Sequence, residues 1–162
     1  MTPLEYRSID NQFGLQLHPR EFQRLTQWCA VADRIETGGI LIGMYNPQHD
    51  TATVSQVLPA PPDSKAGPTW FERGTKGLRA ALEQAWRTER THYLGEWHYH
   101  PNAAPNPSPR DQSQMRDPKL RRGFRVVEPI MLIIGGHSST NWATRAFVYP
   151  KDGVQIEDLL RN

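Results

Sequence analysis

The pattern of hydrophobic and polar residues predicts a sheet of six strands. Two apolar runs next to glycines, at 40–44 and 130–136, are typical of buried strands. Residues 51–58 alternate β-branched and polar side chains after a turn, which predicts an antiparallel hairpin with 40–44. Residues 141–148 are expected to pair with 130–136 in the same way. The predicted strands are, in chain order, 13–17 at an edge of the sheet, 40–44, 51–58, 93–100, 130–136 and 141–148.

Helical spacing of apolar residues predicts two helices, one beginning at Pro19 and one covering 71–90. A third is expected from Ser108 to about Arg116, and the tail 154–160 is expected to form a short closing helix. Strands that alternate irregularly with helices indicate an α/β (α+β) fold, a mixed sheet flanked by helices. The expected apolar faces of the first two helices are Phe22, Leu25, Trp28, Cys29 and Ala32, then Leu78, Ala81, Leu82, Ala85 and Trp86.

Two positions outside these elements have more than one interpretation. His18 precedes the first helix and is expected to be a helix cap or surface group, although a histidine there could also be a ligand. Residues 59–69 (PAPPDSKAGPT) are expected to form an irregular loop, because prolines remove amide donors and fix φ. A loop this long is either functional or a simple connector.

Composition narrows the class of protein. The 162 residues, 37% hydrophobic and 22% charged, fit one domain spanning 1–162. A net charge of +2 gives no case for nucleic-acid binding, and the apolar runs are too short to span a membrane. No signal peptide is recognisable. The one cysteine, Cys29, excludes an internal disulfide and a cysteine-based zinc cluster, so a reducing, cytoplasmic location is expected.

The stretch 95–111 concentrates residues that bind metals. His98 and His100 are two apart on a predicted strand, so their side chains should point to the same face. Asp111 comes from the start of the next predicted helix. Two imidazoles and a carboxylate are typical of hydrolytic zinc sites and of some iron(II) sites. The alternative is a pair of surface or hydrogen-bonded histidines.

Neighbouring residues raise three further expectations. Glu96 shares the histidine face; we expect an ordinary polar position, with the alternative that it accepts a hydrogen bond from an imidazole N–H. Trp97, Tyr99 and Tyr93 are expected to face the other way and pack. Ser108 has the spacing of a helix N-cap in a capping box, which would hold the acid three residues later near the histidines.

The segments ETGGILIG and HYHP-x6-SPRD together resemble the JAMM (MPN+) metallopeptidase family. In that family a glutamate precedes an apolar strand, and H-x-H-P, six residues and S-x-x-D follow. Tyr99 stands where serine or threonine is commoner, but this side chain is expected to point away from the metal. The resemblance implies a cytidine-deaminase-like mixed sheet. The single cysteine, Cys29, argues against a nucleoside deaminase itself, because that class needs cysteine ligands.

The resemblance also implies a role for each site residue. His98, His100 and Asp111 would bind Zn²⁺. Glu36 would be the general base that takes a proton from the attacking water, and Ser108 would stabilise the tetrahedral oxyanion. Taken alone, Glu36 would be only a solvated acid before a strand.

The resemblance further implies a deubiquitinase-like isopeptidase that cuts after the extended C-terminal tail of a conjugated protein. In its small size the chain resembles the bacterial JAMM peptidases of CBASS anti-phage operons. Those peptidases remove conjugates from a cGAS-like nucleotidyltransferase and are encoded beside an E1–E2-like conjugating enzyme. One alternative is a peptidase acting on a ubiquitin-like sulfur-carrier protein. Another is a non-catalytic MPN interaction module, although such modules typically lack the ligands. Neither nucleic acid nor membrane is an expected partner.

Overall fold

The main sheet closes on itself. The computed structural model describes residues 2–117, 126, 128–150 and 157–161. Within them eight strands follow the spatial order β1-β10-β9-β8-β7-β3-β4-β2, and β1 pairs with β2 to complete the ring. The pairs β7–β8 and β2–β4 are parallel and the others antiparallel, so the predicted mixed sheet is confirmed. The strands are β1 Leu4–Arg7, β2 Gly14–Leu17, β3 Thr37–Tyr45, β4 Thr51–Val57, β7 His92–Pro101, β8 Ile130–Gly136, β9 Ala143–Val148 and β10 Glu157–Arg161.

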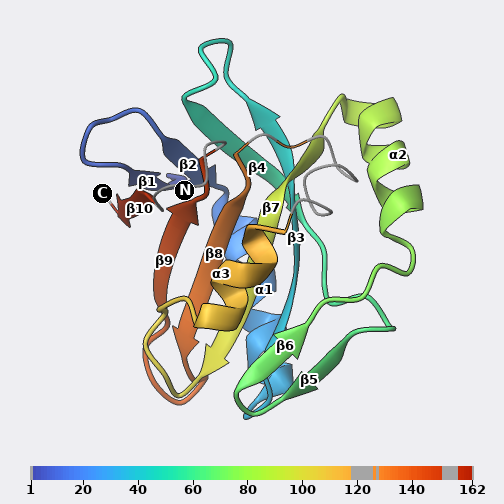
Figure 1. Cartoon of the computed structure of the whole chain (residues 1–162), viewed down its shortest axis with the longest axis vertical. Helices are drawn as coiled ribbons and strands as arrows, with labels where there is room; N and C mark the ends of the chain where they lie inside the picture. Colours follow the sequence, from blue (N-terminus) through green and yellow to red (C-terminus); the bar gives the residue numbers. More distant parts are fainter. Residues whose placement is uncertain (1, 118–125, 127, 151–156, 162) are drawn as a thin grey trace.

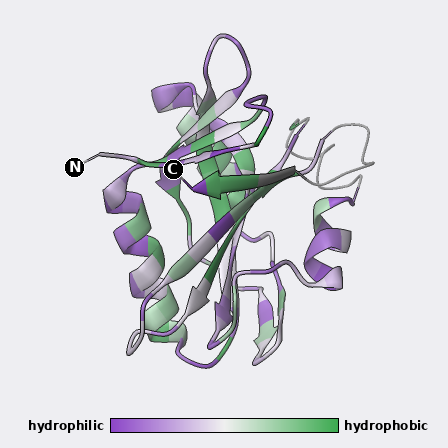
Figure 2. Ribbon diagram, turned by 90° about the vertical axis from the view of Figure 1, so that its left-hand side faces the viewer, coloured by the Kyte–Doolittle hydropathy of each residue, from purple (hydrophilic) through white to green (hydrophobic). Residues whose placement is uncertain are grey.

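Three helices of the described residues cover the sheet from two sides: α1 Pro19–Ala32, α2 Leu78–Glu89 and α3 Pro109–Met115 (Figure 1). Leu25 and Cys29 of α1 join the largest buried cluster, which also contains Trp97 and Tyr99 of β7. Separate clusters on the other face lie beneath α2 and α3. Figure 2 shows the hydrophobic residues gathered in the strands, between helices of mixed hydropathy. No helix in the described part of the chain is both long and apolar enough to cross a membrane.

The closing helix predicted at the C-terminus is wrong where the structure describes it, and so is the edge position of 13–17. Residues 157–161 form β10, which pairs with both β9 and β1; 154–156 lie outside the described residues. The sequence pattern predicts no strand at β1, but β1 is present and β2 pairs with both β1 and β4. These short terminal strands have weak periodicity of their own and are stabilised by their pairing partners.

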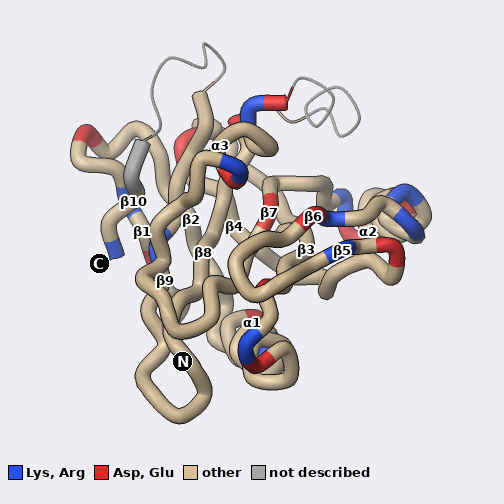
Figure 3. Tube along the Cα trace, turned by 60° about the horizontal axis from the view of Figure 1, so that its bottom comes forward, with Lys and Arg blue, Asp and Glu red and all other residues tan. Residues whose placement is uncertain are grey.

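The proline-rich segment 59–69 is not wholly irregular. Its end forms β5 (Lys65–Gly67), which pairs with β6 (Trp70–Glu72) as a two-stranded hairpin. The helix predicted over 71–90 therefore begins only at Leu78, and Trp86, expected on its apolar face, is 52% exposed. Charged residues of both signs lie together on α2 and around this hairpin (Figure 3).

An irregularity in β7 reverses the expected direction of Tyr93. The pairing with β3 shifts between Leu41 and Ile42, so Tyr93, predicted to face away from Glu96, lies on the same side. Its hydroxyl donates to Glu96 Oε1 at 3.4 Å. Downstream of the shift Trp97 and Tyr99 do pack in the main core, as predicted. The alternation of side chains is thus correct only within one uninterrupted register.

Gly95 lies at this irregularity and is expected to tolerate no side chain. An added Cβ would overlap the carbonyl oxygen of Ile130 in the adjacent strand β8. Gly95→Ala should therefore lower the free energy of unfolding by about 1–3 kcal/mol or more, since backbone would have to move. Denaturant unfolding measures this. Gly77→Ala is the control, because Gly77 also has positive φ but open space around it; equal losses in both variants would contradict the proposed overlap.

Candidate metal centre

Two elements bring the three predicted ligands together. Strand β7 presents His98 and His100 on one face, and Asp111 comes from the first turn of α3. One nitrogen or oxygen atom from each of the three lies within 4.8 Å of the others. His98 Nδ1 is 2.9 Å from Asp111 Oδ1, and His100 Nε2 is 3.2 Å from Asp111 Oδ2. The side chains are therefore close enough to share one ion.

A capping box fixes the carboxylate of Asp111. The Ser108 hydroxyl oxygen accepts the Asp111 backbone N–H at 3.1 Å, and Asp111 Oδ2 accepts the Ser108 N–H at 2.8 Å. Pro109 occupies the first turn, where its missing N–H costs nothing. The predicted cap is confirmed, and it directs the acid toward the histidines.

The cluster is buried and strongly polarised. His98, His100 and Asp111 are 0%, 7% and 3% exposed. Burial alone would raise the pKa of Asp111, but the two imidazoles and the Ser108 N–H outweigh it and hold that pKa well below its usual range. Burial likewise opposes a charge on His98, yet Asp111 and Glu96 raise the pKa of His98 to about 9. The surrounding carboxylates thus favour a positive charge at this point.

The donor atoms fit a divalent cation. His100 Nε2 is buried and, among the described residues, has no hydrogen-bond partner, although Asp111 Oδ2 is nearby. Leaving such an atom unsatisfied costs free energy, and coordination to a metal would satisfy it. Two imidazole nitrogens and a carboxylate oxygen are ligands that zinc accepts, and this metal often keeps one further position open. The residues present therefore fit a metal ion.

Glu36 lies at the start of β3, beside the cluster. Thr37 pairs with Tyr99 across the antiparallel strands, which brings the preceding residue next to His100. The Glu36 backbone N–H donates to the carbonyl of Gly67 at 3.0 Å, so the β5–β6 hairpin holds its main chain. Glu36 is 8% exposed, and burial raises the pKa of its carboxyl above the ordinary value. A base with a raised pKa is suited to proton transfer near neutral pH.

Glu96 belongs to the site and is not the ordinary polar position that we expected. It is 3% exposed and forms an ion pair with Arg73 Nε at 2.9 Å. Its second oxygen lies 3.4 Å from His98 Nε2. Burial opposes ionisation, but His98 and Arg73 outweigh it, so the pKa of Glu96 is lowered. An outer carboxylate of this kind orients an imidazole whose other nitrogen faces a metal.

The β5–β6 hairpin forms a wall of the centre that sequence reasoning missed. The Phe71 ring meets the His98 ring edge-on, with centroids 5.2 Å apart. The Arg110 guanidinium lies over Trp70 and reaches Glu72 at 3.4 Å. Arg73 follows directly after β6. The only sequence signal for this wall was the aromatic pair WF after a proline and glycine turn.

His18 is not a member of the site. Its Nδ1 accepts the Arg20 backbone N–H at 3.2 Å, so it caps α1 as expected.

Comparison with known proteins identifies the family. Residues 18–148 match the model described as prokaryotic homologs of the JAB domain. A protein of Enterobacter hormaechei subsp. hoffmannii named CD-NTase/cGAS isopeptidase is 37% identical over 134 residues, which cover 83% of this chain and 74% of that protein. A Pseudomonas aeruginosa protein of the same name is 30% identical over 136 residues, covering 80% of this chain and 82% of its own length.

Solved structures share the fold. The solution structure of protein DSY2949 from Desulfitobacterium hafniense has a TM-score of 0.65 at 20% identity and covers 88% of this chain and 87% of its own. A protein from Salinibacter ruber has a TM-score of 0.57 at 18% identity, with 88% and 86% covered. The resemblance seen in the motifs is thus confirmed along most of the chain, which belongs to the family of prokaryotic homologs of the JAB domain.

Proposed function

We propose that this protein is a zinc-dependent isopeptidase that removes conjugates from the C-terminus of a cGAS-like nucleotidyltransferase in the bacterial cytoplasm. The observation that carries the chemistry is the convergence of His98, His100 and Asp111 on one point with the buried Glu36 beside them. The substrate class is supported by the two relatives named CD-NTase/cGAS isopeptidase.

The roles of the side chains follow from their positions. His98, His100 and Asp111 would hold zinc, which supplies acidity to a water molecule and draws electron density from the scissile carbonyl. Glu36 accepts a proton from that water as the water oxygen attacks the carbonyl carbon. Glu36 then gives the proton to the leaving amine as the C–N bond breaks. The same carboxyl thus serves as base and as acid.

Ser108 can combine two tasks. Its oxygen already accepts the Asp111 N–H, so the hydroxyl proton remains available as a donor. We propose that it donates to the oxyanion of the tetrahedral intermediate. The loss of one such donor typically costs about 10²–10³ in rate.

The proposed substrate enters as an extended tail. The β5–β6 hairpin and the 101–107 loop are our candidates to flank it. Arg145 of β9 donates to the Asn106 side chain, and Asn102 N–H donates to the Gly136 carbonyl, so β8 and β9 both hold this loop. Ordered walls would align the scissile bond without the cost of ordering a mobile segment.

Cleavage of a fusion protein tests the proposal. The substrate is a cGAS-like nucleotidyltransferase joined through its C-terminal carboxyl to a reporter, and release is followed with and without a chelator. We expect release that the chelator abolishes and zinc restores. A ubiquitin-like sulfur-carrier protein bearing the same reporter tests the alternative. Cleavage of only the sulfur-carrier fusion would move the assignment to that class, and cleavage of neither would favour a non-catalytic module.

Glu96 is expected to position His98 rather than to react. Glu96→Gln should weaken zinc binding by about 10–100-fold, as loss of an outer carboxylate typically does. Competition with a chromogenic chelator measures the zinc dissociation constant.

The same change removes the charged partner of the buried Arg73 and should lower stability. The double variant Glu96→Gln/Arg73→Gln is the control, because it removes both charges: stability should recover while zinc binding stays weak. Unchanged zinc affinity in Glu96→Gln would contradict this role.

A further inference from the structure

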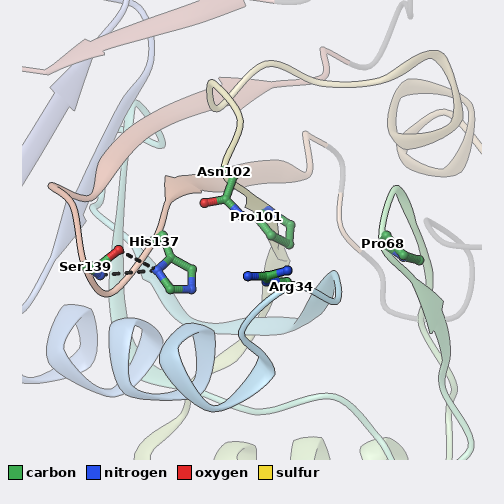
Figure 4. A pocket seen from close by; sticks show the side chains of 6 residues that line it. All are labelled: Arg34, Pro68, Pro101, Asn102, His137 and Ser139. Carbon is green, nitrogen blue, oxygen red and sulfur yellow. Dashed lines mark hydrogen bonds between the residues drawn. The ribbon is translucent and has the colours of Figure 1, made fainter.

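A cavity of about 410 Å³ lies where the segments that precede Glu36 and follow His100 meet the tip of the β5–β6 hairpin, and no role described above uses it (Figure 4). Its volume lies within the range of ligand-binding clefts, about 300–1,000 Å³. Pro101 on its wall directly follows His100, and Arg34 precedes Glu36 by two residues. The cavity is lined by Arg34, Pro68, Pro101, Asn102, His137 and Ser139.

Hydrogen bonds between three segments hold this cavity in shape. The Tyr99 hydroxyl contacts the Asp33 carbonyl at 2.9 Å and the Gly136 carbonyl at 3.2 Å, which links the end of α1 to the end of β8. The Asn102 N–H donates to the same Gly136 carbonyl at 2.9 Å. These hydrogen bonds fix the three backbone segments relative to one another. The segments carry the side chains of Arg34, Asn102 and His137. A preformed site loses little free energy to ordering when a ligand binds.

The polar groups of the cavity divide into engaged and available ones. His137 Nδ1 accepts the Ser139 N–H at 3.3 Å, and Nε2 faces Asp33 Oδ1 at 2.6 Å, so both ring nitrogens are used. Asp33 is directed to His137 and does not line the cavity. Arg34 is exposed, and the described residues give it no salt bridge. Figure 4 shows its guanidinium between the His137 ring and Pro101. The lining thus carries one uncompensated positive charge.

We propose that this cavity is a specificity subsite for an acidic side chain, Asp or Glu, in the tail of the protein substrate. The Arg34 guanidinium pairs with the carboxylate, and Asn102 is a second polar residue of the same lining. Guanidinium groups match carboxylates in a two-pronged geometry that lysine cannot reproduce. The subsite rests on the proposed isopeptidase function, because it assigns the cavity to the same tail that is cut next to it.

A panel of tail–reporter fusions tests the subsite. Each of the six positions before and the three after the scissile bond is made Glu or Gln in turn, and kcat/KM is measured for the wild type and for Arg34→Gln. At one position we expect the wild type to prefer Glu by roughly 10-fold or more, the value of a charge-assisted hydrogen-bonded pair. Arg34→Gln should abolish that preference, because it should lower kcat/KM for the Glu substrate more than for the Gln substrate. The fusions are also made with a free and with an amidated C-terminus. Comparing the two shows whether the cavity binds a side-chain carboxylate or the terminal carboxylate of the chain.

The outcomes distinguish the two proposals. Arg79→Gln is the matched control, since Arg79 is an exposed arginine on α2 whose salt bridge, among the described residues, is with Glu83 of the same helix; it should keep the wild-type preference. Cleavage without a Glu preference at any position, or a preference that survives Arg34→Gln, overturns the subsite but not the isopeptidase. A preference only for the free C-terminus reassigns the cavity to a terminal carboxylate and overturns the side-chain proposal. If the wild type cleaves no fusion of the panel, the proposed function itself fails, and the subsite fails with it.

Discussion

Glu36→Gln is expected to abolish nearly all cleavage while leaving the metal centre intact. Glutamine has the same shape but cannot take a proton from water, and positioned acid–base catalysis contributes about 10²–10⁴ in rate. The hydrogen bond from the Glu36 backbone N–H to the Gly67 carbonyl does not involve the side chain and should persist. Stopped assays of the fusion protein should show kcat reduced by at least 10²-fold with one equivalent of zinc retained.

The pH dependence gives the same residue a second test. Glu36 acts as a base only when ionised, and its pKa is raised by burial. Activity should therefore fall as the pH is lowered through this raised pKa, and it should be lost at a higher pH than an exposed glutamate would predict. Cleavage by Glu36→Gln at the wild-type rate would contradict the role of Glu36 as the base.

Asp111→Asn is expected to have the largest effect on zinc content. The amide is a poor metal ligand and removes the negative charge that faces both imidazoles. The loss of zinc affinity should exceed the ~10–100-fold that removal of an outer partner costs. Elemental analysis after dialysis against a weak chelator should find little zinc in this variant and about one equivalent in the wild type.

The control for Asp111→Asn separates coordination from helix capping. Ser108→Ala removes the hydroxyl that caps α3 and should cost about 1 kcal/mol of stability. It leaves the Asp111 carboxylate in place, so zinc should be retained while turnover falls. If Ser108→Ala lost as much zinc as Asp111→Asn, the cap rather than the ligand would explain the effect.

The spacing of residues was sufficient to predict that the candidate metal ligands lie together, but not that the β5–β6 hairpin forms a wall beside them. H-x-H on an extended segment necessarily places two imidazoles on one face, and the capping box brings Asp111 toward them. Both are local rules, and both are met. Glu36 could not be found from local rules, because its position beside His100 depends on how β3 pairs with β7. Only the family resemblance supplied it.

The errors of prediction share a physical cause. Arg73 was placed in a helix, whereas it leaves the β5–β6 hairpin and meets Glu96, so the buried ion pair could not be foreseen. Tyr93 was assigned to the wrong face because the shift beside Gly95 does not show in the alternation of side chains. In each case a contact between distant segments decided the local conformation, as it often does in strands and loops.

Closure of the main sheet decides where a guest peptide could form backbone hydrogen bonds. Each of its eight strands already has two neighbours, so no strand offers a whole open edge of amides and carbonyls for strand addition. In the described part of the chain, the β5–β6 hairpin pairs with no further strand, and the start of β3 (Thr37 to Gly39) pairs with β7 but not with β4. A segment that pairs with either of these edges would lie against the wall of the metal centre, where the proposed function requires the scissile bond.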